Sequence, residues 1–519
     1  MLESDVLIIG GGIAGGTTAL RLADEGYNVV MLTRAKETVE SNTRYAQGGI
    51  IYKGEDDTPE LLQEDIEIAG GFHSNPEAAR ILATEGPARV QEFLIQYVGV
   101  EFDKTTDGEL ALALEGGHSL PRIVHAADTT GRAIEEALVE KLYQHTNITI
   151  LPQMTAIDLL TPAHHSTNRQ RIYEPLSCVG AYVFDQQTGE VRTIIANQTV
   201  LATGGLGQIY TYTTNPYGSR GDGIAMANRA GARTANLEYI QFHPTALVQR
   251  DAPRFLISEA VRGAGARLVH ADGTPFMDKY DPQRKDLSTR DIVARAIYNE
   301  MILSSATNMY LDVSNYVNHD EIMHHFPSIY ENCLQYGIDI TKDPIPVAPA
   351  AHYSCGGVWT DMNGKTSIDR LYAVGEVACT GLHGANRLAS TSLLEGLVFG
   401  YRAAEDIASH IQETSYPAVD EIPDWVDQGE HEADPALIAQ DLMTLRSIMW
   451  NYVGLVRKTD LLERALRDLA NLEHEIERFY QTAKLSDELI GLRNMARTSR
   501  LVTEQAWANK HSLGSHYRE

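Results

Sequence analysis

The chain has 519 residues, of which 43% are hydrophobic and 22% are charged. A single hydrophobic core rarely serves a chain of this length, so we expect two or three globular domains rather than a fibrous or disordered protein. The 70 acidic residues outnumber the 43 lysines and arginines and give a formal charge of −27, which repels nucleic acid and anionic bilayers. Any anionic ligand must therefore meet arginines that are placed locally.

Cysteine usage and the N-terminal segment indicate a cytoplasmic protein without a metal site. The cysteines are scattered and form no C-x-x-C pair or zinc-type spacing: Cys178, Cys333, Cys355 and Cys379. The acidic start Met1–Asp5 differs from the basic leader of an exported protein, and five glycines interrupt the apolar stretch Val6–Leu20. We therefore expect no targeting signal and no transmembrane segment.

The first residues predict a strand, a glycine-rich turn, a helix and a second strand. Val6–Ile9 and Val29–Leu32 are short apolar runs, and the helical pattern between them ends at Gly26. The turn reads Gly10-x-Gly12-x-x-Gly15, which lets backbone N–H groups at the helix start approach a pyrophosphate, although ligand-free turns can look alike. Arg34 follows the second strand where an acidic ribose ligand is expected, which disfavours NAD.

Later segments predict how the chain is divided. Thr199–Gly205 and Leu371–Glu376 are apolar runs that end in glycine, as buried parallel strands often do, and we expect them in the same sheet. The nucleotide-binding domain would then comprise residues 1–236 and 340–415, interrupted by an inserted capping domain at 237–339 with a helical pattern at Asp291–Met301. A linker at Ser415–Pro435 and helical leucine spacing predict a C-terminal helical bundle within residues 416–519.

Five short glycine-containing motifs follow one another along the chain: Gly10–Gly15, Ala46–Gly49, Ala202–Gly205, Gly221–Gly223 and Gly375–Glu376. Together they resemble the FAD site of the succinate dehydrogenase/fumarate reductase flavoprotein family, over roughly residues 5–405. The resemblance implies an α/β fold, with a discontinuous Rossmann-like FAD-binding domain, an inserted α+β capping domain and a C-terminal helical bundle. The residues that it assigns to FAD are Gly10, Gly11, Gly12, Ile13, Ala14, Gly15, Arg34, Asn42, Thr43, Arg44, Tyr45, Ala46, Gln47, Gly48, Gly49, Thr155, Ala156, Ala202, Thr203, Gly204, Asp222, Glu376, Ser392 and Leu393.

Asn42 bears on how the cofactor is held. Family members that attach FAD covalently use a histidine at this position, and asparagine cannot form that link. The resemblance therefore implies one noncovalently bound FAD per chain. It also implies a helix that begins near Ser390–Leu393, whose dipole would stabilise negative charge on the reduced flavin.

Further motifs resemble the residues that hold a four-carbon dicarboxylate in this family: Gln241–Thr245, Ser258–Gly263, Thr289–Asp291, His352–Tyr353 and His383–Arg387. The resemblance assigns substrate binding to Glu115, Gln241, His243, Ser258, His352, Arg387 and Ser390. It assigns proton transfer to Arg290, with Glu259 and Arg262 as a relay. Arginines suit this task because a guanidinium can bind a carboxylate through two charge-assisted hydrogen bonds.

Each of these residues also has an ordinary structural explanation. His243 before a proline is typical of a turn, and Arg290 with Asp291 can form an ion pair at a helix start. Glu115 precedes a Gly-Gly pair and can be a surface residue, whereas Met443–Tyr452 has the pattern of a helix-bundle core.

The segments Leu114–Ser119 and Arg122–Gly131 are similar to the corresponding stretch of L-aspartate oxidases within the family. This implies oxidation of L-aspartate to iminoaspartate by hydride transfer to flavin N5, with oxygen or fumarate as acceptor, toward quinolinate and NAD. Glu115 would then pair with the substrate ammonium. Because iminoaspartate is unstable in water, channelling to quinolinate synthase is chemically attractive, although no motif supports it. The alternatives are a soluble fumarate reductase, a subunit that relays electrons to an iron–sulfur partner, and a non-catalytic nucleotide-binding scaffold.

Overall fold

A computed structural model describes residues 2–250, 252, 254–411, 419–426 and 429–519. Its largest sheet has seven strands in the order β6-β2-β1-β9-β8-β7, with β16 also paired to β9. The bounds are β1 Leu2–Ile9, β2 Val29–Thr33, β6 Ile148–Pro152, β7 Met154–Leu159, β8 Gly180–Asp185, β9 Val191–Leu201 and β16 Leu371–Ala373. Strand β9 is parallel to both β1 and β16, which confirms that three distant segments form one sheet.

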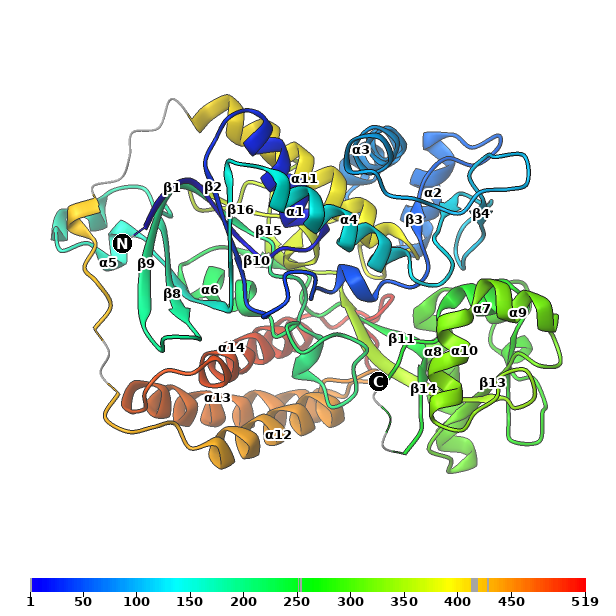
Figure 1. Ribbon diagram of the computed structural model, residues 1–519. Coiled ribbons are helices and arrows are strands. Elements are labelled where there is room, and N and C mark those ends of the chain that lie inside the picture. Colours follow the sequence, from blue (N-terminus) through cyan, green and yellow to red (C-terminus); the bar gives the residue numbers. More distant parts are fainter. Residues whose placement is uncertain (1, 251, 253, 412–418, 427–428) are drawn as a thin grey trace.

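Helices cover one face of this sheet. Helix α1 (Ile13–Asp24) packs against α4 (Thr130–Gln144) and α11 (Thr391–His410), and Figure 1 shows the three together. Leu20 and Leu22 of α1 are fully buried, as expected for a helix enclosed on several sides. Next to them lie α2 (Pro59–Ala69), α3 (Pro76–Arg89), a π-helix (Val90–Val98) and the small sheet β3 (Ile50–Ile51), β5 (Ile123–Val124) and β4 (Leu112–Ala113).

The capping unit is a four-stranded sheet flanked by helices, at the right of Figure 1. Its strands are β11 (Ile240–Leu247), β14 (Ile345–Ser354), β13 (Met309–Asp312) and β12 (Arg267–Val269), and its helices are α7 (Glu259–Gly263), α8 (Arg290–Ser304), α9 (His319–His325) and α10 (Pro327–Gln335). Helix α8 confirms the helix that was predicted at Asp291–Met301. Strand β14 belongs to this sheet but lies beyond residue 339, where the predicted inserted domain ends. The bounds 237–339 for the capping domain therefore stay a proposal.

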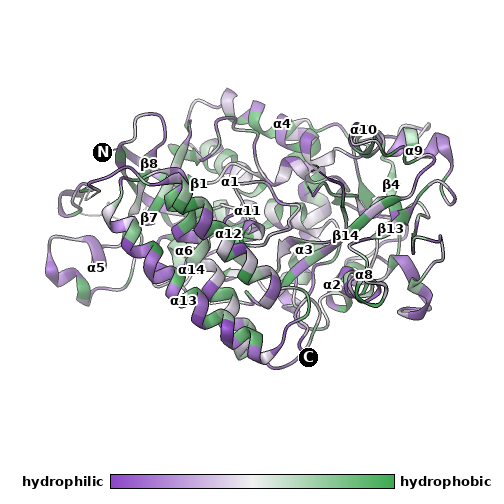
Figure 2. Cartoon of the chain, turned by 90° about the horizontal axis from the view of Figure 1, so that it is seen from below, coloured by the Kyte–Doolittle hydropathy of each residue, from purple (hydrophilic) through white to green (hydrophobic). Residues whose placement is uncertain are grey.

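The C-terminal unit is a helical bundle of α12 (Pro435–Tyr452), α13 (Thr459–Thr482) and α14 (Asp487–Ala508). Leu462, Leu469 and Ile476 form the buried face of α13, and purple and green segments alternate along the bundle in Figure 2. Helix α14 also packs against α6 (Asp222–Arg229) of the FAD-binding-like domain. The predicted linker Ser415–Pro435 lies in part outside the described residues.

The remaining α-helix and strands of the described chain are short. They are α5 (Pro162–His165) and the sheet formed by β10 (Thr234–Ala235), β15 (Gly357–Trp359) and β17 (Ala378–Cys379). In the described part of the chain, no helix is long and apolar enough to cross a membrane. Nor does that part contain a group of side chains arranged to bind a metal ion.

Candidate active site

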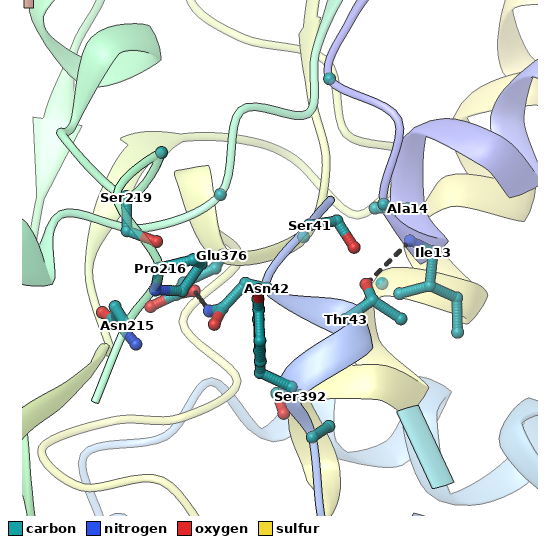
Figure 3. Close-up of a pocket in the computed structure, with 18 of the residues that line it drawn as sticks. Ile13, Ala14, Ser41, Asn42, Thr43, Asn215, Pro216, Ser219, Glu376 and Ser392 are labelled. Carbon is teal, nitrogen blue, oxygen red and sulfur yellow. Dashed lines mark hydrogen bonds between the residues drawn. The ribbon is translucent and has the colours of Figure 1, made fainter. Parts of the chain in front are cut away.

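A long cavity opens where β1, β2, β9 and β16 end, the edge at which parallel sheets bind ligands. Helix starts and loops that are far apart in sequence meet there, as Figure 3 shows for Ile13, Thr43, Asn215 and Ser392. The predicted residues that line the cavity are Gly10, Gly11, Gly12, Ile13, Ala14, Arg34, Asn42, Thr43, Tyr45, Ala46, Gln47, Gly48, Gly49, Glu115, Thr155, Ala156, Ala202, Thr203, Gly204, Asp222, His243, Ser258, Glu259, Arg290, His352, Glu376, Arg387, Ser390, Ser392 and Leu393.

Four predicted residues do not line the cavity. A Cβ on Gly15 would lie 2.1 Å from the carbonyl oxygen of Gly10, so this glycine lets α1 approach β1 instead of facing the ligand. Gln241 and Arg262 lie behind the cavity and bond to residues that do line it. Arg44 is half-buried in a short helix at Thr43–Tyr45 and also lies off the lining.

The glycine-rich turn leaves a helix start open toward the cavity. Gly10 has φ +116°, and a Cβ there would lie 2.1 Å from the carbonyl oxygen of Ala202. The N-cap residue of α1, Gly12, has no side chain to cap the helix, and the first turn has no acidic residue. One N–H of this turn, that of Ile13, donates to Thr43 Oγ1 at 3.0 Å. The positive end of the helix dipole is therefore available to an anion such as a pyrophosphate.

A second helix start faces the same cavity. Helix α11 begins at Thr391, as was predicted near Ser390–Leu393, and Ser390 before it adopts a left-handed φ of 56°. The side chain of Ser390 does not cap this helix, and Ser392 and Leu393 line the cavity. Two helix starts whose N-cap residues make no side-chain capping bond therefore lie at the same cavity.

Polar atoms on the cavity wall also indicate a polar ligand. Gln47 Oε1, Thr203 Oγ1 and Asn215 Oδ1 are buried and have no hydrogen-bond partner among the described residues. Buried polar atoms of this kind are normally satisfied, so a ligand with many donors and acceptors fits this wall. FAD has that character. Asn42 Nδ2 donates to Glu376 Oε2 at 2.9 Å, which places an amide where covalent family members carry histidine.

Arg290 is the first residue of α8 and lines the same cavity as the starts of α1 and α11. Its Nε donates to Glu259 Oε2 at 2.7 Å, and its NH1 donates to Gln241 Oε1 at 3.0 Å. Asp291 instead pairs with Arg295 at 2.8 Å, so the ion pair between adjacent residues at the helix start does not form. Burial opposes ionisation of Glu259, but Arg290 and Arg262 outweigh it and hold its pKa below the usual value.

Arg387 approaches the cavity from the loop before α11. Its NH1 donates to Ser392 Oγ at 3.2 Å, and its guanidinium lies 4.3 Å from the centre of the Tyr353 ring. Burial and the nearby Arg290 lower the pKa of Arg387 to about 10, so it stays charged at neutral pH. Its Nε has no partner among the described residues, which leaves a donor for a ligand.

The two histidines form a neutral pair, with ring centres 5.0 Å apart. Burial and the neighbouring Arg290 lower the pKa of both His243 and His352 well below the usual value. The Thr245 N–H donates to His243 Nδ1 at 3.2 Å, so the proton of the neutral His243 ring is on Nε2. His243 can thus donate one hydrogen bond from Nε2.

Glu115 is a buried carboxyl group and not a surface residue, since it is only 3% exposed. Ser390 Oγ donates to its Oε2 at 2.6 Å. Burial and the charge of Glu259 raise the pKa of Glu115. A cation that binds beside Glu115 would lower this pKa and favour the ionised carboxylate. Arg122, which pairs with Asp65 at 2.6 Å, anchors the segment that carries Glu115.

Charge at this end of the cavity suits a doubly negative ligand. Arg262, Arg290 and Arg387 contribute three positive charges and Glu259 one negative charge, which leaves two positive charges when Glu115 is neutral. A dicarboxylate balances those two charges. Because these side chains are buried, the attraction is stronger here than on the acidic surface.

The cavity wall also contains polar residues to which the motifs had assigned no role, among them those of a loop and a tyrosine. The loop from Thr214 to Ser219 lines the cavity with Thr214, Asn215, Pro216, Gly218 and Ser219, and Thr214 Oγ1 is 2.8 Å from His352 Nδ1. Only the Asn-Pro turn signal marked this loop in the sequence. Tyr353 was quoted within a motif but given no role, and it supports Arg387.

Comparisons with known proteins agree with this arrangement. A model of the FAD binding domain matches residues 5–393, and a model of the fumarate reductase flavoprotein C-terminus matches residues 443–519. The chain is 47% identical to L-aspartate oxidase 1 of Ralstonia nicotianae over 520 residues, covering 99% of this chain and 95% of that protein. It is 45% identical to L-aspartate oxidase of Yersinia pestis over 518 residues, with the same coverage.

Solved structures show the same fold. A chain of E. coli quinol fumarate reductase superposes with a TM-score of 0.90 at 26% identity, covering 100% of this chain and 92% of that one. Sdh1 of Mycobacterium smegmatis gives a TM-score of 0.82 at 28% identity, covering 100% and 89%. The predicted combination of FAD-binding domain, capping domain and C-terminal helices is therefore confirmed.

Proposed function

The chain belongs to the L-aspartate oxidases of the fumarate reductase flavoprotein family, and on this premise we propose that it oxidises L-aspartate to iminoaspartate with one noncovalently bound FAD. The observation that carries this proposal is the buried Glu115 beside the arginine cluster. A dicarboxylate alone needs only the arginines, whereas an amino-dicarboxylate also brings an ammonium that a carboxylate can pair with.

FAD would be held by the polar wall and the two helix starts. We assign it to those lining residues that were predicted to bind FAD, together with the loop from Thr214 to Ser219 that the motifs did not mark. When bound, FAD supplies the acceptor for the hydride that leaves the substrate Cα. The unpartnered Gln47, Thr203 and Asn215 oxygens would be satisfied by it.

The substrate would lie among the buried charges. Arg387, His243 and His352, with Ser258, would bind the two carboxylates, since the histidines are neutral donors and the guanidinium keeps a free Nε. Gln241 contributes indirectly: it accepts from Arg290 and donates to the carbonyl oxygen of Arg387 at 2.8 Å, so it fixes both arginines.

Two groups could handle protons. Glu115 would pair with the ammonium and take its proton, because its raised pKa makes the carboxylate a better base than an exposed glutamate. A guanidinium is a poor base near neutral pH, so we assign Arg290 to binding and to proton donation in the fumarate-reducing direction. Glu259 and Arg262 would relay a proton to it, and they lie 3.6 Å apart.

We further propose oxygen or fumarate as electron acceptor; fumarate is a dicarboxylate and can bind the same arginines. Quinolinate synthase remains the partner that would consume the unstable product. The second candidate function, a soluble fumarate reductase, rests on the same arginines, but it gives the buried Glu115 no ammonium to pair with.

An anaerobic titration tests the function. FAD-loaded protein is mixed with L-aspartate, and the absorption of the oxidised flavin is followed, with D-aspartate and succinate as controls. We expect L-aspartate alone to bleach the flavin. No bleaching by L-aspartate, with reoxidation of dithionite-reduced protein by fumarate, would favour the fumarate reductase instead. A flavin that responds to no dicarboxylate would favour the scaffold or the electron-relay subunit.

A further inference from the structure

The first residue of α14 reaches from the C-terminal bundle into the FAD-binding domain. Asp487 is only 8% exposed. Its Oδ2 accepts from Arg34 NH1 at 3.1 Å and from Arg220 NH1 at 3.0 Å. Its Oδ1 accepts from Thr155 Oγ1 at 2.6 Å and from Arg220 NH2 at 3.1 Å. One carboxylate thus binds three side chains of another domain.

Two of those three side chains, Arg34 and Thr155, line the cavity. The third reaches the cavity through a neighbour, because Arg220 donates to Asp222 at 2.9 Å and Asp222 lines the cavity. Asn494 lies about two turns further along α14 and donates to the other oxygen of Asp222 at 2.8 Å. Helix α14 therefore fixes Asp222 from two sides.

We propose that Asp487 is a positioning residue for FAD, through which the C-terminal helical bundle determines cofactor affinity. The inference rests on the proposed function, since it takes the cavity as the FAD site. Asp487 touches no cavity space itself; it orients Arg34 and Thr155 directly and Asp222 through Arg220.

Charge explains why a carboxylate is needed at this position. The Asp487 carboxylate lies between the guanidiniums of Arg34 and Arg220. Without it, these two positive charges would repel each other with no negative charge between them. Burial alone would raise the pKa of Asp487, but the two arginines outweigh it and hold the pKa below the usual value. The start of α14 adds to this stabilisation of negative charge. An amide would place its NH2 against an arginine donor, so the arrangement requires the ionised acid.

A matched control is available in the same interface. Asp158 of β7 bridges α6 and α14, through Arg229 at 2.6 Å and Arg493 at 2.8 Å, but none of the three residues lines the cavity. Replacing Asp158 by Asn therefore weakens the contact between the domains without touching the cavity wall.

The experiment compares Asp487→Asn and Asp158→Asn with the unmodified full-length protein. FAD affinity is measured from the flavin fluorescence change on binding, and kcat with L-aspartate is measured at saturating FAD. We expect Asp487→Asn to raise the Kd for FAD by about tenfold or more, and Asp158→Asn to change it by less than about twofold. Because the role is positioning of the cofactor, kcat at saturating FAD should stay within about twofold for both variants.

Two results would overturn the inference. One is an unchanged Kd for Asp487→Asn; the other is an equal loss in both variants, which would mean that only the domain contact matters. If Asp487→Asn does not fold, Asp487→Glu replaces it: this variant keeps the negative charge but displaces the carboxylate from Arg34, Thr155 and Arg220, and an unchanged Kd there overturns the inference as well. If the unmodified protein binds no FAD at all, the proposed function itself fails. If it binds FAD but Asp487→Asn binds FAD equally well, only the positioning role of Asp487 fails.

Discussion

Arg290 and Glu259 form a buried ion pair in which the guanidinium Nε donates to the carboxylate Oε2 at 2.7 Å. The pair fixes Arg290 in one orientation at the start of α8, and Gln241 holds NH1 from the other side at 3.0 Å. A Cβ on Gly116 would lie 2.0 Å from Glu259 Oε1, so this glycine keeps the space for the carboxylate. Glu115 thus contributes a carboxyl group next to the arginines, and the adjacent Gly116 leaves room for Glu259.

Replacing Arg290 by Leu should lower kcat/KM for L-aspartate by about a thousandfold or more, because a charge that is oriented at the substrate is lost. FAD affinity should change little, since the side chains to which Arg290 donates within the described part of the chain, Glu259 and Gln241, are not among those assigned to FAD. Arg290→Lys keeps the charge but not both hydrogen bonds, so its kcat/KM should lie between those of the unmodified protein and Arg290→Leu. Steady-state kinetics on FAD-loaded protein decide this, and normal turnover in Arg290→Leu would exclude the assigned role.

Glu115→Gln distinguishes the two candidate functions. The amide can still bond to Ser390 but cannot pair with an ammonium, so kcat/KM for L-aspartate should drop by about a hundredfold. Fumarate reduction, which involves no ammonium, should change by less than about threefold. The exposed Glu109→Gln is the control for the segment. Equal losses in both reactions would show that Glu115 serves the fold and not the amine.

The cofactor should be released when the protein is denatured. Asn42 is engaged with Glu376 and offers no nucleophile for a bond to the flavin. Acid precipitation should therefore leave about one FAD per chain in the supernatant. Flavin that stays with the precipitate would show a covalent link at another residue.

Glu135 should make stability depend on pH. It is fully buried on α4, and burial raises its pKa to about 8 from an ordinary 4.5. The folded protein prefers the neutral acid, so its contribution is complete below pH 4.5 and is lost as pH rises toward 8. Glu135→Gln stays neutral, and between pH 5.5 and 7.5 its advantage over the unmodified protein should grow by about 3 kcal/mol. Thermal midpoints at the two pH values test this; a constant difference would contradict it.

The segment near Gly514 should support the substrate loop. Gly514 has φ +52°, and a Cβ there would lie 2.5 Å from the carbonyl oxygen of Ala385, two residues before Arg387. Arg295 of α8 also donates to the Gly514 carbonyl oxygen at 2.7 Å. Gly514→Ala should therefore raise KM for L-aspartate by about tenfold through displacement of this loop.

The control for that substitution is Gly273→Ala. Gly273 also has a positive φ, +84°, but a Cβ there would meet no atom within 4 Å. Both variants carry the backbone strain, and only Gly514→Ala carries the clash. An equal KM in the two variants would show that the contact with Ala385 has no effect on the substrate loop.

Local patterns in the sequence determined the parts of the fold that depend on neighbouring residues. The apolar runs at Val6–Ile9 and Val29–Leu32 became β1 and β2, and the glycine pattern after β1 became a helix start on a cavity. Such features can be read because strand, turn and helix propensities act over a few residues. The resemblance of short motifs to a flavoprotein family then named the chemistry.

Only the tertiary structure decided which side chains face the ligand and which support them. Gly15, Gln241 and Arg262 belong to the motifs but lie behind the wall, whereas Asn215 lies on it. Asp487, 453 residues from Arg34, has no local signal of its role at all. The physical reason is that burial, charge balance and hydrogen-bond partners depend on packing between distant segments, and these set the protonation of Glu115 and the position of Arg34.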